Sequence, residues 1–455
     1  MKKRMCKIMA LAMTAAMVVP MAAQTTAFAA DDKEITYWNI AVESPDKDIV
    51  TAAVDKFNKE TKSGYTVNQV AIQNDTYKEK LVIAMSSGEC PDMYSSWSGG
   101  PMYEYIDSGF AQPIDDLLDQ SDVKDKLLDA AIEQGSYNGH VYAIPYLNVS
   151  LAGIFYNKDM FKQYGLEEPK TLADLENICA TLKENGITPF ALANASKWTG
   201  SMYFMSLAAR YGGLEPFQNA VAGTGKFTDD CFIKAGEKIQ EWVKNGYFPD
   251  GVNSLSEDDG QAKQLMYQET AGMLLCGSWY TGTFQTDSEE FYQKIGWFPF
   301  PAIDDSDADP TIQIGTVGDQ FISFNCEGDK LAAAFECATD HLSDEVEDMI
   351  YSTGKIAPVK DAGDHISDPV VKEIFDAAQE ASSIQLWYDQ YLPTSVASAH
   401  LDGLQEVFGL TKTPQEAQEE MQTAMDEYLS TKSDSGAADD TAEEATDDAA
   451  ADDAE

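Results

Sequence analysis

Residues 34–72, EITYWNIAVESPDKDIVTAAVDKFNKETKSGYTVNQVAI, decide the fold class. The stretch begins and ends with a short apolar strand, and between the two strands apolar residues recur at helical spacing from Ile49 to Phe57. Ser44 is expected to cap this helix, with Pro45 in its first turn. A strand, a helix and a second strand in this order imply parallel pairing with a right-handed crossover.

The same alternation continues along the chain, whose 455 residues predict two or three domains. The last third is mostly helical, which predicts an α/β chain with a helical C-terminal portion. The further strands are expected at 92–94, 141–145, 154–156, 271–276 and 321–325, and the further helices at 77–86, 171–184, 331–350, 370–382, 401–408 and 414–429.

The charge balance is strongly acidic, with a formal net charge of −46 against an ordinary hydrophobic fraction of 44%. A chain of this charge repels phosphate backbones and anionic lipid headgroups, so neither nucleic acid nor a membrane surface is expected as a partner. The expected partner is neutral, cationic or another protein.

The two ends of the chain differ from the body. A basic start, an apolar run broken by Pro20 and a small-x-small pattern ending at Ala29 predict a signal peptide over residues 1–29, cleaved after Ala29 or Ala30. Residues 431–455 are nearly all small or acidic, which predicts a disordered, solvated tail. An exported protein without membrane insertion is expected.

The cysteines do not form a disulfide pattern. Cys6 precedes the expected cleavage site, and the other six lie singly with no Cys-x-x-Cys pair, which favours small buried hydrophobic side chains over bridges, although their pairing stays open. These six are Cys90, Cys179, Cys231, Cys276, Cys326 and Cys337.

Signatures of catalysis, cofactors and metals are missing from the sequence. There is no Gly-x-Ser-x-Gly elbow, phosphate-binding loop, dinucleotide fingerprint or His-Glu-x-x-His pair. The alternating acids at Asp305, Asp307 and Asp309 have Pro310 where a calcium loop needs its glycine, so a surface loop is expected. No enzymatic activity, cofactor or metal is therefore predicted.

Aromatic residues at strand ends are more informative. In open α/β sheets, ligands lie beyond the carboxyl ends of the strands. Sugar rings have apolar C–H faces and a rim of hydroxyl groups, so flat aromatic side chains beside Asp, Asn and Glu acceptors suit them. Trp242 and Trp297, by contrast, have the surroundings of core residues.

Several segments, in this order, resemble the extracellular solute-binding proteins of carbohydrate-uptake ABC transporters, the group that includes maltose-binding protein. The most specific are GHVYAIPY at 139–146, IFYNKD at 154–159, and GL and PKTL at 165–166 and 169–172; SGECPD at 87–92, GITP at 186–189 and GMLLCGSW at 272–279 support them. The resemblance covers nearly the whole body from Ile35 to Leu429. The turn at 156–159 is expected to be structural, with Asn157 or Asp159 as a helix cap.

The resemblance implies a two-lobed periplasmic-binding-protein fold with the solute held in a cleft, and closure by a hinge between rigid lobes. Chain crossings are expected near Asn148, near 315–318 and near 359–365. The implied divisions are residues 30–147 with 318–362 for one lobe, 148–317 with 363–430 for the other, and 431–455 for the tail.

The resemblance also implies a site made by the residues after the strands of each lobe. The aromatic members would stack on sugar rings, and the acidic and amide members would accept hydrogen bonds from hydroxyl groups. The expected substrate-binding residues are Trp38, Glu43, Trp97, Tyr146, Asn148, Trp198, Trp279, Trp387 and Asp389.

The function implied is extracytoplasmic binding of a sugar, an oligosaccharide above all, by a monomer that delivers it to the permease subunits of an ABC transporter. Lipoprotein relatives carry a cysteine directly after the apolar run, but here Cys6 precedes it, so no lipid anchor is expected and the protein would be periplasmic or secreted. The alternatives are a binding protein for a polyamine or glycerol phosphodiester, a secreted glycoside hydrolase, and a surface adhesion protein.

Overall fold

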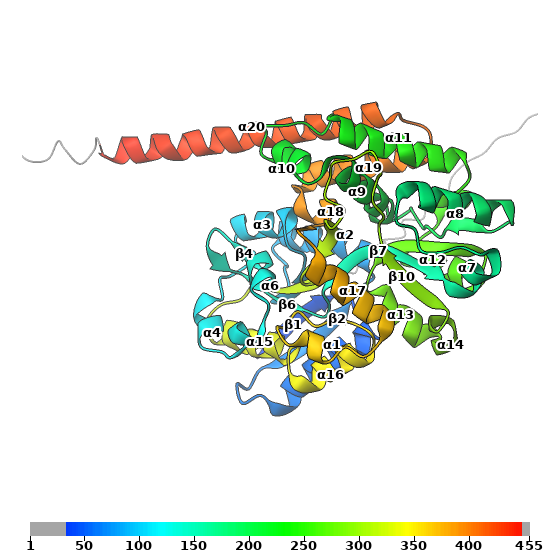
Figure 1. Ribbon diagram of the computed structural model, residues 1–455. Helices are drawn as coiled ribbons and strands as arrows, with labels where there is room; N and C mark the ends of the chain where they lie inside the picture. Colours follow the sequence, from blue (N-terminus) through cyan, green and yellow to red (C-terminus); the bar gives the residue numbers. More distant parts are fainter. Residues whose placement is uncertain (1–32, 448–455) are drawn as a thin grey trace, which may run out of the picture.

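The computed structural model describes residues 33–447, with side chains through 432. The expected signal peptide over 1–29 lies outside the described residues. Figure 1 shows two lobes of strands and helices, with the long C-terminal helix α20 running along one of them and out from the body. None of the described helices combines the length and the apolar character that a membrane span requires.

The first lobe is built on a sheet of order β2-β1-β3-β12-β6. β1 and β2 pair in parallel over their whole length, from Glu34↔Thr66 to Asn39↔Ala71, which confirms the expected strand–helix–strand unit. The strands are β1 (Glu34–Asn39), β2 (Thr66–Ala71), β3 (Met93–Ser96), β6 (Ala143–Tyr146) and β12 (Gln320–Phe324), and the main helices are α1 (Asp46–Glu60), α2 (Asn74–Ser87), α3 (Gly100–Asp107), α15 (Gly328–Asp340) and α16 (Asp344–Ser352). Short elements complete it: α4 (Asp115–Asp119), α5 (Val123–Lys126), α6 (Asp129–Gln134), β4 (Ser136–Tyr137) and β5 (His140–Val141).

The second lobe is built on a sheet of order β13-β11-β7-β9-β8, with β10 also paired to β7. β7 and β9 are buried at every position, as befits strands covered by helices on both faces. The strands are β7 (Ser150–Asn157), β8 (Thr188–Phe190), β9 (Ala271–Gly277), β10 (Ile295–Pro299), β11 (Gln313–Thr316) and β13 (Ile384–Gln385). The helices are α7 (Lys158–Tyr164), α8 (Leu172–Glu184), α9 (Trp198–Gly212), α10 (Glu215–Val221), α11 (Asp230–Lys244), α12 (Gln261–Tyr267), α13 (Tyr280–Asp287), α14 (Glu289–Tyr292), α17 (Pro369–Glu380), α18 (Tyr388–Tyr391), α19 (Thr394–Phe408) and α20 (Pro414–Asp447), with 3-10 turns at Val252–Ser254 and Ala362–Asp364.

The chain passes between the two lobes three times. The first two passages lie between β6 and β7 and between β11 and β12. The third lies between α16, which packs on α1 of the first lobe, and α17, which packs on β10 of the second. Asn148 joins these passages. Its side-chain oxygen accepts a hydrogen bond from the backbone N–H of Ile356 at 2.8 Å, and its carbonyl accepts one from Asp319 N–H at 2.7 Å. One cluster of buried apolar side chains extends through both lobes, so the molecule has a continuous core.

Several helices differ from the expected ones. The predicted helix at 331–350 is two helices, α15 and α16, separated at His341–Ser343. The helix predicted at 401–408 begins earlier, at Thr394. Ser44 does not cap α1; its hydroxyl donates to the Asp48 carboxylate at 2.7 Å instead. Asn157 caps α7 by accepting from the N–H groups of Asp159 and Met160, as expected.

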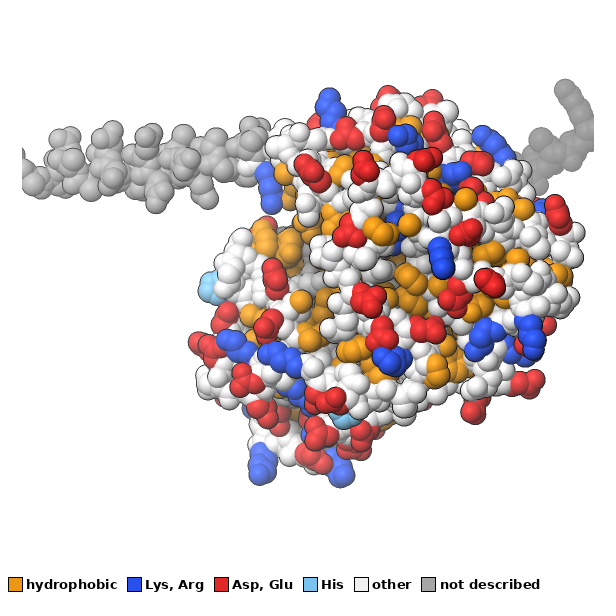
Figure 2. Space-filling model, in the orientation of Figure 1, with side chains coloured by type: hydrophobic (Ala, Val, Ile, Leu, Met, Phe, Trp, Pro, Cys, Tyr) orange, Lys and Arg blue, Asp and Glu red, His pale blue; other side chains and the backbone are white. Residues whose placement is uncertain are grey.

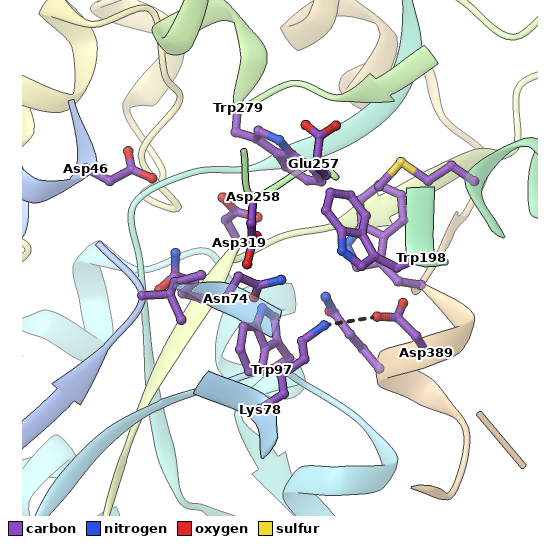
Figure 3. A pocket seen from close by; sticks show the side chains of 15 residues that line it. Asp46, Asn74, Lys78, Trp97, Trp198, Glu257, Asp258, Trp279, Asp319 and Asp389 are labelled. Atoms are coloured by element: carbon purple, nitrogen blue, oxygen red, sulfur yellow. Dashed lines mark hydrogen bonds and ion pairs between the residues drawn. The ribbon is translucent and has the colours of Figure 1, made fainter. Parts of the chain in front are cut away.

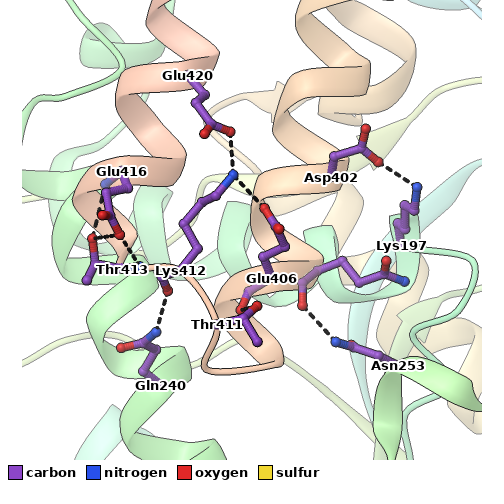
Figure 4. A network of polar contacts seen from close by, with 11 residues as sticks. Lys197, Gln240, Asn253, Asp402, Glu406, Thr411, Lys412, Thr413, Glu416 and Glu420 are labelled. Carbon is purple, nitrogen blue, oxygen red and sulfur yellow. Dashed lines mark hydrogen bonds and ion pairs between the residues drawn. The ribbon is translucent and has the colours of Figure 1, made fainter.

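The C-terminal tail also differs from expectation. α20 is a helix to Asp447, whereas the sequence predicts a disordered, solvated tail from residue 431; residues 448–455 lie outside the described residues. Alanine has the highest helix propensity and recurs through this acidic segment, which favours a helix. Polar contacts fasten the start of α20 to α19: the Lys412 ammonium contacts the carboxylates of Glu406 and Glu420 (Figure 4).

The surface carries the charge that the composition predicts. Asp and Glu outnumber Lys and Arg on the face drawn in Figure 2. The six cysteines of the described body are free thiols, four of them buried, and the expected surface loop at 305–309 has exposed aspartates.

Candidate functional site

A cavity of about 760 Å³ lies between the two lobes. Its walls come from the segments after β1, β3 and β9, from α2 and α9, from the loop before α12, and from the residues at the start of β12 and at α18 (Figure 3). We call it the cleft. It is lined by Ile40, Asp46, Asn74, Lys78, Trp97, Trp198, Met202, Glu257, Asp258, Trp279, Asp319, Gln320, Trp387, Asp389 and Gln390.

Three tryptophans of the second lobe lie together on one side of the cleft. The ring centroid of Trp279 is 6.0 Å from that of Trp198 and 6.0 Å from that of Trp387, with interplanar angles of 58° and 69°. Trp279 folds back over the end of β9, where a side chain at Gly277 would lie 2.0 Å from its ring. Three indoles at steep angles form a concave apolar wall that can contact more than one face of a ring-shaped ligand.

Trp97 of the first lobe lies on the opposite side of the cleft, beside the only lysine of its lining (Figure 3). The Lys78 ammonium is 5.0 Å from the ring centroid of Trp97 and 3.4 Å from the Asp389 carboxylate of the second lobe. The lysine therefore joins the two lobes through its ion pair with Asp389, while its cation–π contact with Trp97 lies within the first lobe.

The cleft contains more carboxyl groups than cations. Burial raises the pKa of the Asp319 carboxyl to about 7, although the charge of buried Lys355 lowers it in part. Burial likewise raises the pKa of Glu257 to about 7, although the hydrogen bond from the Tyr280 hydroxyl lowers it in part. Burial also raises the pKa of Asp258. Lys355 is ion-paired to Asp46. Near pH 7 the carboxyl groups of Asp319 and Glu257 can both accept and donate hydrogen bonds, which suits a ligand rich in hydroxyl groups.

The structure brings five of the nine predicted site residues into the lining of this cleft. Glu43 lines an adjoining cavity of about 710 Å³ instead, where it forms an ion pair with Lys263 at 3.5 Å. The five in the cleft are Trp97, Trp198, Trp279, Trp387 and Asp389.

Three predicted residues lie outside the cleft. Tyr146 is fully buried, with its hydroxyl hydrogen-bonded to Tyr37, Ser95 and Gln320, so it supports Gln320 from behind. Asn148 is 1% exposed and joins the chain crossings. Trp38 packs against the small core cluster below α2, because alternate residues of β1 point to opposite faces of the sheet.

Other lining residues were not predicted. Asp46 and Asn74 each follow an expected strand, and Asp319 and Gln320 follow an expected crossing, so the sequence held a usable signal for these four residues. Glu257 and Asp258 lie in a loop that no strand precedes, and Lys78 and Met202 lie on helices. Their sequence neighbourhoods carry no sign of a ligand.

The fold and the cleft define a two-lobed α/β protein that holds a ligand between its lobes. Residues 41–338, more than half of the chain, match the family model of bacterial extracellular solute-binding proteins, and the protein belongs to that family.

Individual proteins agree with this. The chain is 32% identical over 228 residues, half of each chain, to an uncharacterized ABC transporter extracellular-binding protein of Pyrococcus horikoshii. It is 30% identical over 178 residues to the multiple sugar-binding protein of Streptococcus mutans, covering 36% of this chain and 39% of that protein. The alignments thus span half or less of these curated relatives.

The fold similarity extends further. A solved structure from work on xylan utilization by the thermophilic bacterium Caldanaerobius polysaccharolyticus superposes with a TM-score of 0.78 at 29% identity, over 86% of this chain and 99% of the other. The two-lobed architecture is therefore shared along nearly the full length of that protein.

Proposed function

We propose that the protein binds a sugar, an oligosaccharide above all, in the cleft and delivers it to the permease of an ABC transporter. The observation that carries the proposal is the set of four tryptophans facing one cavity, with carboxyl groups between them. Indole faces contact the C–H surface of sugar rings, while carboxyl and amide oxygens accept hydrogen bonds from hydroxyl groups. The sugar-binding name of the Streptococcus mutans relative and the xylan context of the 29% identical structure support it.

Delivery would depend on closure of two rigid lobes around the ligand. We assign residues 30–147 with 318–362 to one lobe and 148–317 with 363–430 to the other, and the division of the strands between two sheets supports this assignment. The ligand would contact Trp97 of one lobe and the tryptophans of the other, so its binding free energy favours the closed state.

The protein would act outside the cytoplasm as a monomer, after removal of residues 1–29. Catalysis has no part in this proposal, since the role of the carboxyl groups is to accept and donate hydrogen bonds.

A cationic solute such as a polyamine is the second candidate. The observation that favours it is the set of five carboxyl groups in the cleft against a single lysine in its lining: Asp46, Glu257, Asp258, Asp319 and Asp389 against Lys78. The sugar remains the first candidate because two of these groups, Asp46 and Asp389, are already paired with lysines.

A thermal-shift panel tests the proposal. Xylo-, chito- and malto-oligosaccharides are compared with spermidine and glycerol phosphate, and the oligosaccharide samples are afterwards analysed for shortened products. A ligand present at 100 times its Kd stabilises the folded state by about 2.7 kcal/mol, which raises Tm by a few degrees. A rise with one sugar class and intact oligosaccharide is expected. A rise with spermidine alone would contradict the sugar, and shortened products would contradict a binding protein.

A further inference from the structure

A third cavity, of about 800 Å³, adjoins the cleft on the far side of Trp97. It shares Lys78, Trp97, Asp389 and Gln390 with the cleft, so the Lys78–Asp389 ion pair lies between the two spaces. We call this third cavity the annex. The lining that belongs to the annex alone consists of Leu81, Val82, Pro101, Met102, Tyr105, Thr394, Ala397, Ser398 and Leu401.

The annex differs from the cleft in chemistry. Seven of the nine residues that belong to it alone are apolar or aromatic, and none is charged. Its only charged groups are the shared Lys78 and Asp389, which are paired with each other. A further sugar unit would need acceptors for several hydroxyl groups, and the annex supplies only the hydroxyls of Thr394, Ser398 and Tyr105 beside the shared polar groups.

One wall of the annex carries apolar surface that the fold itself leaves uncovered. Val82 on α2 is 46% exposed and is one of four large apolar side chains that are exposed in the described chain. Its neighbour Ile83 is 66% exposed but does not line the annex. Covering apolar surface that is in contact with water is favourable, so an apolar ligand group that packs on this surface would bind more tightly.

Both lobes contribute to the annex, and they are joined beside it. α2 and α3 come from the first lobe, and α18 and α19 from the second. The Glu104 carboxylate of α3 accepts hydrogen bonds from the backbone N–H of Thr394 at 2.9 Å and from its hydroxyl at 2.6 Å. A group in the annex would therefore be held between the same lobes as a sugar in the cleft.

We propose that the annex binds an apolar substituent, such as an alkyl or aryl aglycone, attached to the end of the sugar that lies against Trp97. The inference rests on the proposed sugar-binding function and assigns the ligand class more narrowly, as a glycoside or glycoconjugate. The occupant follows from two observations: the annex shares four lining residues with the sugar cleft and so adjoins it, and its own walls match a hydrocarbon group.

The test compares methyl with hexyl β-glycosides of xylose, glucose and N-acetylglucosamine by calorimetric titration of the full chain, below the concentration at which hexyl glycosides form micelles. Each fully buried methylene raises affinity about fourfold. Because burial of a hexyl chain in an open cavity is incomplete, we expect the hexyl glycoside to bind at least about tenfold more tightly than the methyl glycoside of the same sugar.

Three variants locate the effect. Val82→Asp places a charge in the annex and Ser398→Phe fills it; each is expected to remove the hexyl advantage and leave the methyl glycoside affinity within about twofold. Ile83→Asp, on the next and more exposed position of α2, is the matched control and should keep the advantage. Val82 and Ile83 are solvent-exposed, so their substitution should change the stability little. A melting curve of each variant checks that it folds.

The outcomes separate the two proposals. Equal affinities for methyl and hexyl glycosides would overturn the annex and leave the sugar function standing. A hexyl advantage that survives Val82→Asp and Ser398→Phe would also overturn it, because the chain would then lie elsewhere. A gain in affinity for longer oligosaccharides that these variants abolish, without a hexyl advantage, would assign the annex to sugar units. Failure of every glycoside and of the parent oligosaccharides to bind would overturn the sugar function itself.

Discussion

At the scale of single residues, Trp279 is the centre of the cleft, because it contacts both other tryptophans of the second lobe and lines the adjoining cavity as well. Trp242 and Trp297, in contrast, are buried in the core as the sequence predicts. The Trp297 ring fills the space over Gly153, where a Cβ would lie 2.2 Å from it.

Replacing Trp279 by Ala is expected to weaken oligosaccharide affinity at least tenfold, because aromatic anchors at the centre of a contact carry about 2 kcal/mol or more. Calorimetric titration measures the change. Trp242→Phe is the control: it alters the core of the second lobe, away from the cleft, and should reduce Tm while leaving affinity unchanged. Equal losses of affinity in the two variants would contradict a direct role for Trp279.

Asp319 makes stability depend on pH. Burial raises its pKa in the folded state to about 7 from the ordinary value of 3.8, so its contribution to stability is fully present below about pH 4 and is lost as the pH rises through 7. Asp319→Asn removes this dependence. We expect the variant to gain free energy of unfolding relative to the wild type as the pH rises from 4 to 8, measured by urea unfolding at several pH values.

The buried histidines make stability depend on pH in the opposite direction, and this dependence cancels when Asp319→Asn is compared with the wild type. Burial lowers the pKa of His341 to about 4 and that of His400 to about 3, so both cost stability as the pH falls below about 6.5, in the variant as in the wild type. A difference between variant and wild type that stays constant with pH would contradict a raised pKa at Asp319.

At the scale of elements, the chain crossings depend on Asn148. Asn148→Ala would leave the buried N–H of Ile356 without its acceptor, at a cost of about 1–3 kcal/mol in the free energy of unfolding. The loss should appear in urea unfolding, whereas Asn245→Ala, at an exposed position, should change little. If Asn148→Ala lowers sugar affinity without lowering stability, the residue contacts ligand after all.

The contact between α3 and the segment before α19 is equally tight. A Cβ at Gly100 would lie 2.2 Å from the carbonyl oxygen of Leu392, so Gly100→Ala must push this segment of the second lobe away from the first. Because Asp389 and Gln390 lie just before it, oligosaccharide affinity is expected to fall by about tenfold in a calorimetric titration. Ser108→Ala, at the exposed end of α3, is the control, and equal affinities in both variants would contradict the idea.

Sequence reasoning located part of the site through the strand-end rule. Trp97 follows β3 directly, Trp279 follows β9 after Ser278, and both line the cleft. The same rule placed Tyr146 and Asn148 there, because it identifies the edge of the sheet and not the direction in which a side chain points; Tyr146 points into the core. Glu257 and Asp258 could not be found, since their place in the cleft depends on how the lobes meet, which is set by contacts distant in the sequence.

The sequence predicted more of the fold than of the site. Hydrophobic periodicity located β1, α1 and β2 and some later elements, such as α2, α8, β7 and β9, because it reflects the burial of one face of each element. It did not locate others, among them α9, α12, β10 and β11. It failed where apolar spacing continues across a break, as between α15 and α16.

At the scale of the whole molecule, several polar contacts join the two lobes beside the cleft. Besides the Lys78–Asp389 pair, Asp258 of the second lobe accepts a hydrogen bond from the backbone N–H of Asp75 at 3.1 Å, and Lys263 reaches Glu43 at 3.5 Å. Partly exposed ion pairs contribute little, about 0–1 kcal/mol each, so a ligand that contacts both walls can decide the balance between open and closed states.

The most direct measurement is a calorimetric titration of the protein with xylo-, chito- and malto-oligosaccharides, carried out in parallel on the wild type, Trp279→Ala and Trp242→Phe. We expect one bound oligosaccharide per chain for the wild type and Trp242→Phe, and at least a tenfold loss of affinity for Trp279→Ala. Absence of binding by every oligosaccharide, or binding that Trp279→Ala leaves unchanged, would contradict a sugar held by the tryptophans of the cleft.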